Sequence, residues 1–290
     1  MLNLFRAQWY RLVRNRAFWG LLVVYGLICT FALVSLGSNY HGQEGFWDLP
    51  SLLPLADAAL FLDPQDYLGR VGGALWVPLL TCLLVATFFA DDLSDGSCRN
   101  LAVSTHFRPD YLVSAAVLTA GVAVLFVVVG FAVVLAVTSF FPHLSVTWEM
   151  GRFGRWALAV VLASVVYGML TLAVVLISRR LALAVLFGFL LALGQVEVGI
   201  LALVDLAGEC LVSLGIASPW SIAPLSPDMF MRNSAERHFQ DWALAFPAGQ
   251  LGGPLSSLYE VPTAVDMLVL VAWLAAAIGL CWIIMRRKRL

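Results

Sequence analysis

The stretch FADDLSDGSCRNLAVSTHFRPDYL (residues 89–112) is the most polar part of the chain between two long apolar runs. It holds two adjacent acids, a Gly-Ser pair and two spaced arginines, which is more polar chemistry than a simple connection needs. The runs on either side decide the fold, because their length determines whether this stretch joins two membrane spans.

The composition indicates a membrane protein. Of the 290 residues, 61% are hydrophobic and 12% are charged, whereas soluble domains carry about 25% charged residues. The net charge of -1 says little by itself. The five cysteines are odd in number and no CxxC spacing occurs, so neither a disulfide framework nor a metal site is indicated.

Six runs are long enough to span a bilayer as helices. A spanning helix needs ~20 mostly apolar residues, because lipid offers no hydrogen-bond partners to the backbone. The sequence therefore predicts an all-α integral membrane protein with six transmembrane helices. The spans are expected at about residues 17–36, 71–90, 111–141, 154–178, 181–206 and 263–285.

The basic residues predict the orientation. Lys and Arg accumulate on the cytoplasmic side of membrane proteins. With both termini in the cytoplasm, the inner segments hold most of the 17 Lys and Arg residues. The outer segments keep Arg70, Arg152, Arg155, Arg232 and Arg237.

The first 16 residues predict an amphipathic helix. We expect it to lie in the inner headgroup layer, with its arginines toward anionic lipid and its Trp-Phe side buried. A plain basic anchor for the first span is the alternative. The predicted apolar face is Leu2, Phe5, Trp9, Leu12 and Val13, and the basic face is Arg6, Arg11 and Arg14.

Two outer segments, residues 37–70 and 207–262, are long for simple connections. The second carries six prolines among aromatic residues, a composition that argues against disorder. We expect short helices or re-entrant turns that cover the mouth of the helix bundle. A lid without substrate contact is the alternative.

The opening stretch predicts a short helix at the inner face. Asp95 or Ser97 can cap it, and Pro109 is expected to end it before Tyr111 re-enters the membrane. A short helix with charge at both ends suits docking of a soluble partner. An ordinary solvated loop is the alternative.

This stretch resembles the permease subunits of ABC-2-type ATP-binding-cassette exporters. Their pattern is an acid, three residues, Gly-Thr/Ser, one residue and a basic residue, with a later arginine. The resemblance implies that the stretch is a coupling helix, which fits into a cleft of an ATPase subunit. The matching residues are Asp92, Gly96, Ser97, Arg99 and Arg108, with Asn100 beside them.

The resemblance covers the whole chain, and it implies a single transmembrane domain over residues 1–290. It implies two soluble ABC ATPase subunits that bind ATP and Mg, and a second permease subunit in a homo- or heterodimer. Membrane lipid is the other expected partner, and nucleic acid is not expected. The cellular location that the resemblance implies is the cytoplasmic membrane of a bacterium.

The chain itself is not expected to be an enzyme. A P-loop needs the pattern GxxxxGK[ST], and the only lysine is Lys288. The apolar spans suit export of an amphiphile, such as a peptide antibiotic, a drug or a lipid-like molecule. That substrate class rests on the likeness to peptide-antibiotic immunity and multidrug exporters.

Gln195 and Glu197 are polar residues within the fifth predicted span. A carboxylate facing lipid there costs roughly 2.5–3.5 kcal/mol, so Glu197 should face a cavity or a neighbouring helix. It could contact a cationic substrate, carry a proton, or serve structure alone. One alternative function is therefore a standalone proton-coupled secondary transporter that uses Glu197. Another is a membrane-embedded sensor whose outer loop binds a ligand.

Overall fold

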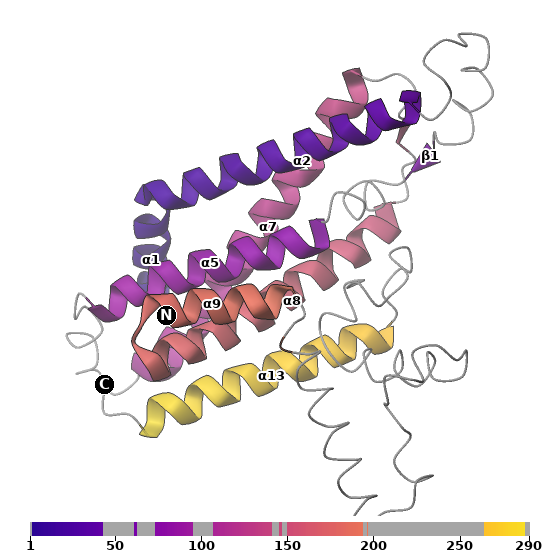
Figure 1. Cartoon of the computed structure of the whole chain (residues 1–290). Helices are drawn as coiled ribbons and strands as arrows, with labels where there is room; N and C mark the ends of the chain where they lie inside the picture. Colours follow the sequence, from indigo (N-terminus) through magenta and orange to yellow (C-terminus); the bar gives the residue numbers. More distant parts are fainter. Residues whose placement is uncertain are drawn as a thin grey trace, which may run out of the picture.

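In the computed structural model, the chain is a bundle of helices (Figure 1). The structure describes residues 2–42, 61–62, 73–94, 107–140, 145–146, 150–193, 196 and 264–287. The helices are α1 (Leu2–Arg14), α2 (Arg16–Gly42), α5 (Gly73–Ser94), α7 (Phe107–Phe140), α8 (Met150–Ser178), α9 (Leu181–Ala192) and α13 (Ala264–Arg287).

The described residues contain four helices that are long and apolar enough to cross a membrane: α2, α7, α8 and α13. The remaining two predicted spans correspond to α5 and to the 12 described residues of α9. Both run beside the long helices in the bundle (Figure 1). The all-helical membrane fold is thus confirmed, and the full count of six spans stays a prediction.

Helix α8 is the centre of the bundle. It contacts α5, α7, α9 and α13, and 72% of the residues in its apolar window are buried, against 22% for α2 and for α13. The outer helices instead expose large apolar side chains, such as Phe31 on α2 (76% exposed) and Leu268 on α13 (68%). Exposed apolar faces of this extent fit hydrocarbon rather than water.

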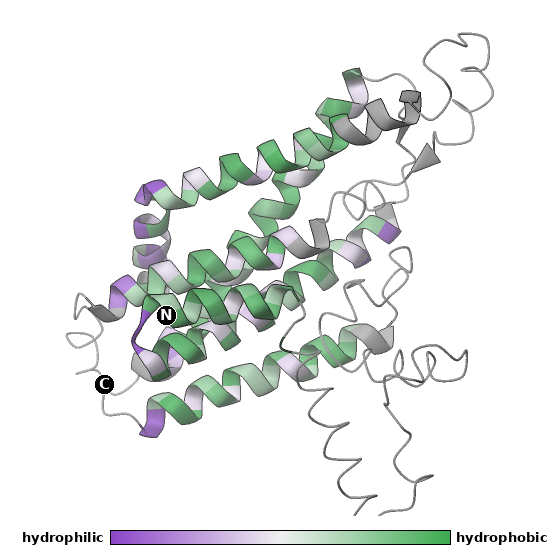
Figure 2. Ribbon diagram, in the orientation of Figure 1, coloured by the Kyte–Doolittle hydropathy of each residue, from purple (hydrophilic) through white to green (hydrophobic). Residues whose placement is uncertain are grey.

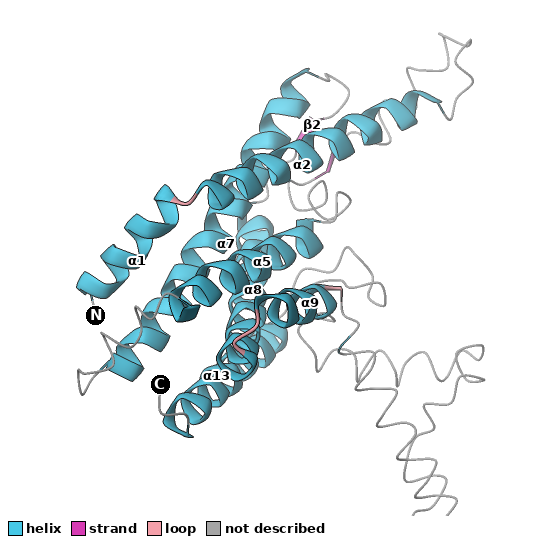
Figure 3. Ribbon diagram, turned by 60° about the vertical axis from the view of Figure 1, so that its left-hand side comes forward, coloured by secondary structure: helices cyan, strands magenta, loops and turns pink. Residues whose placement is uncertain are grey.

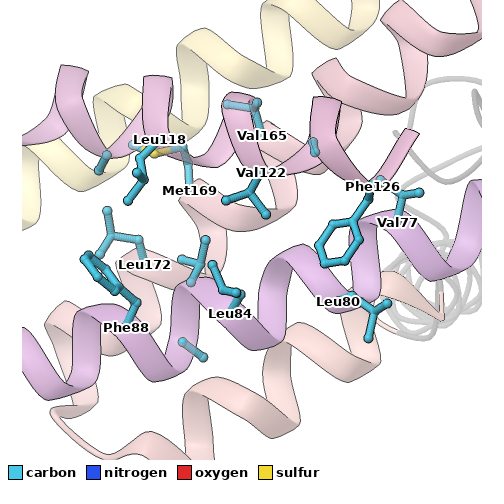
Figure 4. Packing of buried hydrophobic residues seen from close by; sticks show 14 of the residues in the cluster. Val77, Leu80, Leu84, Phe88, Leu118, Val122, Phe126, Val165, Met169 and Leu172 are labelled. Carbon is cyan, nitrogen blue, oxygen red and sulfur yellow. The ribbon is translucent and has the colours of Figure 1, made fainter. Parts of the chain in front are cut away.

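The interior between α5, α7 and α8 is filled with apolar side chains (Figure 4). Three buried hydroxyls within the spans bond to their own helices, since Thr81, Thr119 and Ser164 each donate to the carbonyl four residues earlier. These polar side chains are therefore satisfied without a partner from another helix. The apolar residues labelled in Figure 4 are Val77, Leu80, Leu84 and Phe88 of α5, Leu118, Val122 and Phe126 of α7, and Val165, Met169 and Leu172 of α8.

Two glycines let the helices approach closely. A Cβ at Gly168 of α8 would lie 2.6 Å from Thr119 Cγ2 of α7, and one at Gly188 of α9 would lie 2.9 Å from Cys82 Cβ of α5. Ala159 and Ala163 of α8 are also fully buried, beside α13. Small residues are used in this way where helices associate in lipid.

The small residues of α13 behave differently. Ala277 is buried, but Ala272, Ala275 and Ala276 are exposed and Gly279 has open space around it. Of these small residues of α13, only Ala277 packs against other side chains within the described part of the chain.

Charged residues gather at one end of the bundle, which we call the basic end (Figure 2). Helix α1 lies across this end, and the last turn of α13 ends there too (Figure 1). Arg152 and Arg155 lie at the opposite end of α8. The members of the basic end are Arg6, Arg11, Arg14, Arg16, Asp91, Asp92, Arg179, Arg180, Arg286 and Arg287.

The tight connection between α8 and α9 also belongs to the basic end. Arg179 has a φ of 52°, in the left-handed region that favours glycine. Its N–H donates to the Val175 carbonyl at 2.9 Å, which closes the end of α8. Two residues therefore suffice to reverse the chain, as the predicted ends at 178 and 181 require.

Several helix limits differ from the predicted spans by a few residues, and two of the differences change the interpretation of the sequence. Helix α7 begins at Phe107, so Pro109 lies in its first turn and does not end a preceding helix. Proline is tolerated there because the first N–H groups of a helix have no intrahelical partner. Helix α2 continues to Gly42, so the first outer segment begins as helix.

The outer segments are described only in part. β1 (Phe61–Leu62) pairs in parallel with β2 (Ser145–Val146), in the register Phe61 with Ser145 and Leu62 with Val146. The first outer segment therefore meets the connection between α7 and α8. Its remaining residues after Gly42, and the whole of 207–262, lie outside the described residues.

Substitution of Gly188 tests the close approach of α9. We expect Gly188→Ala to cost about 1–3 kcal/mol, because the new methyl group would overlap the rigid Cβ of Cys82. Gly279→Ala is the matched control, and it should leave the melting temperature of the purified protein equal or higher, since that site is open. Equal melting temperatures for the two variants would contradict the packing described here.

Candidate functional site: the junction of α1, α5 and α7

The candidate site lies where α1 crosses the basic end. Asn15 connects α1 to α2, and its Oδ1 accepts the Ala17 N–H at 2.9 Å, which caps α2. The Trp19 indole N–H donates to the Val13 carbonyl at 2.7 Å, near the end of α1. These two bonds fix the turn between the helices, which Figure 3 shows as a short loop.

One side of α1 faces the bundle. Leu12 is fully buried, and Leu4, Phe5 and Trp9 pack against the main core. Trp9 contacts α7 closely, since a Cβ at Gly121 would lie 3.2 Å from its Cζ3. The apolar side of α1 therefore covers protein.

The apolar side of the predicted interfacial helix is thus covered by the bundle, and its placement in the headgroup layer stays a prediction. Phe5 and Trp9 pack against the bundle, which supplies an apolar surface for them. Val13, which was predicted on the same face, is instead exposed. Helical periodicity identified the apolar face but not the surface that covers it.

Arg11 connects α1 to α5. Its Nη1 donates to Oδ1 of Asp92 in an ion pair, and its guanidinium lies 5.4 Å from the ring centroid of Phe88, one turn earlier on α5. The Asp92 side chain is only 5% exposed, whereas that of Arg11 is 44% exposed. The cation thus compensates a carboxylate that is almost removed from water.

Two predictions about this pair need correction. Arg11 was expected to face anionic lipid, but it turns toward α5. Asp92 was expected to contact an ATPase, but its carboxylate is buried within the chain and bonded to Arg11. Of the predicted basic face, Arg6 and Arg14 are exposed as expected.

Gln8 is a member of this junction that the sequence did not indicate. It is 3% exposed, and among the described residues neither polar atom of its buried amide has a hydrogen-bond partner. An unmatched buried polar group costs about 1–3 kcal/mol. Gln8 therefore weakens the packing of α1 on the bundle, in contrast to Leu12 one turn later.

The other predicted coupling residues are not described. Gly96, Ser97, Arg99 and Asn100 lie outside the described residues, as do Gln195 and Glu197. Arg108 lies in the first turn of α7, and only its backbone is described. Of the predicted site, the structure therefore brings together Asp92 and the residues of α1.

At this junction, α1 contacts both helices that flank residues 95–106 in the sequence, α5 and α7. Arg11 holds the end of α5 that leads into this stretch, and Trp9 packs on α7, which follows it. The sequence matches the family described as ABC-2 family transporter protein over residues 2–290. The chain belongs to the ABC-2 transporter family.

Membership establishes the general role of this permease. It is a multi-pass membrane protein and a membrane transport component that is not itself catalytic. Permeases of this family normally pair with an ABC ATPase subunit. None of the curated proteins compared with the permease matches it significantly.

Substitution of Arg11 tests the ion pair. We expect Arg11→Gln to lower stability by about 1–3 kcal/mol, because it takes the cation away from a buried carboxylate. Asp92→Asn should cost less, since Arg11 is half exposed and can turn to water. The measurement is the melting temperature of the purified permease in detergent.

Arg6→Gln is the control, since this exposed residue should contribute less than about 0.5 kcal/mol. The double variant Arg11→Gln/Asp92→Asn should be more stable than the sum of the single effects, because the buried charge is gone. Strictly additive effects would show that the two side chains do not interact.

Substitution of Gln8 tests the unmatched amide. Gln8→Leu should raise the melting temperature, because an apolar side chain of similar size removes two buried polar atoms without partners. Asn15→Leu, which removes the cap of α2, should lower it. A lower melting temperature for Gln8→Leu would show that the amide has a stabilising partner.

Proposed function

We propose that this permease is the membrane subunit of an ATP-driven exporter. It would have six spans with both termini in the cytoplasm, which makes the basic end cytoplasmic. Two ABC ATPase subunits, which bind ATP and Mg, would dock at this end. The observation that carries the proposal is the attachment of α1 to both α5 and α7, the helices on either side of residues 95–106.

Residues 95–106 would form the contact with the ATPase. Gly96, Ser97, Arg99, Asn100 and Arg108 are the proposed coupling residues, and Asp92 would position them from inside the protein. Because Arg11 and Trp9 connect α1 to both flanking helices, a displacement of the contact would move α5, α7 and α1 together.

Transport by alternating access requires that ATP and substrate each favour one of two conformations of the permease. Movement of α1 together with the adjoining parts of α5 and α7 would provide these two conformations without separating the packed interior of α5, α7 and α8. The buried, unmatched amide of Gln8 supports such movement, because it lowers the cost of displacing α1.

The proposed substrate is an amphiphile, such as a peptide antibiotic, a drug or a lipid-like molecule. The described spans carry almost no charge between their ends, which suits apolar or amphiphilic molecules better than small ions. A second permease subunit, identical or similar, would complete the transporter. The exposed small residues of α13 leave room for close contact with it.

The test is purification of the permease from its native bacterial membrane. We expect an ABC ATPase to copurify with it. Arg99→Glu should greatly reduce the recovered ATPase, because the charge at the proposed contact is reversed. Membrane insertion and melting temperature should not change.

Arg152→Glu is the matched control, since Arg152 lies at the opposite end of the bundle. It should leave the recovery of the ATPase unchanged. Full recovery with Arg99→Glu would contradict the assignment of residues 95–106. Transport by the purified permease alone in vesicles, abolished by Glu197→Gln, would establish a proton-coupled transporter instead.

A further inference from the structure

The outward side of α1 is positively charged, because it has arginines and no acidic residue. Its exposed residues include Arg6, Tyr10, Val13 and Arg14, and Tyr10 is 61% exposed. No Asp or Glu occurs between Leu2 and Arg14. This side lies opposite the face packed on α7, and Arg11 does not contribute to it, because Asp92 holds Arg11 at the bundle.

Arg14 is held in a defined position on this side. Its Nη1 donates to the Tyr10 hydroxyl at 2.8 Å, and its guanidinium carbon lies 5.3 Å from the centroid of the Tyr10 ring. A guanidinium has five N–H donors in a planar fork, which suits the oxygens of a phosphate. A positioned arginine loses less side-chain freedom on binding such a group.

The exposed face of α2 begins directly beside Arg14. At 100° per residue, Arg16, Trp19, Val23 and Leu27 share one side of the helix, and all four are exposed. Trp19 is 50% exposed, yet its ring is held in place by the bond to the Val13 carbonyl. Figure 2 shows the change from hydrophilic α1 to hydrophobic α2 at this turn.

This arrangement matches the parts of one lipid molecule. Val23 and Leu27 offer an apolar track of the kind that acyl chains cover. Trp19 follows Arg16 on the same side of α2, and tryptophan favours the boundary between hydrocarbon and headgroups. Arg16 begins the same track, and Arg14 precedes it by two residues, on the other side of the turn at Asn15.

We propose that the turn between α1 and α2 is a binding site for one anionic phospholipid. Arg14 and Arg16 bind its phosphate, and Trp19, Val23 and Leu27 line its acyl chains. A neutral phospholipid brings its own cation close to the two arginines, so the site prefers a headgroup with net negative charge. This site goes beyond the proposed function, and it does not depend on the direction or substrate of transport.

The test uses the full-length permease in nanodiscs of phosphatidylglycerol and phosphatidylcholine in equal amounts. Native mass spectrometry after release then counts the retained lipids of each kind. The wild-type permease should retain phosphatidylglycerol about tenfold in preference, as expected for two arginines near a lipid phosphate. Arg14→Gln/Arg16→Gln should lose most of this preference.

Arg286→Gln/Arg287→Gln is the matched control, because these two exposed arginines lie at the same end on α13. It should keep the preference. Tyr10→Phe, which removes only the hydroxyl that positions Arg14, should reduce the preference less than the double variant. It serves as the second variant if the double variant is unstable.

Three results would overturn the proposal. Equal retention of both lipids by the wild-type permease would show that no anionic site exists. An equal loss of preference in the α13 control would show a general attraction by the basic end. An unchanged preference in Arg14→Gln/Arg16→Gln, with reduced ATPase recovery, would assign the two arginines to the protein partner.

Discussion

Close contact between helices around α8 is the constraint on which the rest of this structure depends. Within lipid, apolar side chains gain little by leaving their surroundings, so helices associate through close packing. The absence of a side chain at Gly168 allows α8 to pack closely on α7. The absence of a side chain at Gly188 allows α9 to pack closely on α5. The positions of α5 and α7 follow from it, and with them the surface on which α1 lies.

Helix α1 is attached to this bundle by different interactions. At the basic end, water competes with each polar contact, and an exposed ion pair would contribute little. The pair formed by Arg11 and Asp92 differs because the carboxylate is almost buried. Trp9 on Gly121 adds an apolar contact to the other flanking helix. Together they join α5 and α7 through a third helix.

The sequence predicted the membrane fold well because apolar length is a direct requirement of the bilayer. The predicted ends of the α8 and α13 helices at residues 178 and 285 lie within two residues of the observed ends. The start of α7 was predicted four residues late, since Arg108, Pro109 and Asp110 are polar or helix-breaking in most contexts. Their place in a first turn makes them acceptable there.

The candidate site was less predictable. Periodicity showed that α1 is amphipathic, but a protein surface and a lipid surface select the same apolar pattern. The partner of Arg11 lies 81 residues away, and no local spacing reveals a pair of that kind. Gln8 was not singled out, because a glutamine on the apolar face of a short helix is a weak signal in a sequence.

The packed interior bears on where a substrate could cross. Within the described residues, apolar side chains fill the space between α5, α7 and α8 (Figure 4). An amphiphile passing there would have to displace side chains such as Leu84 and Met169, which are 3% and 0% exposed. A path along the outside of these helices requires no such disruption. The packing of α5, α7 and α8 therefore argues against a path between these three helices in the conformation described.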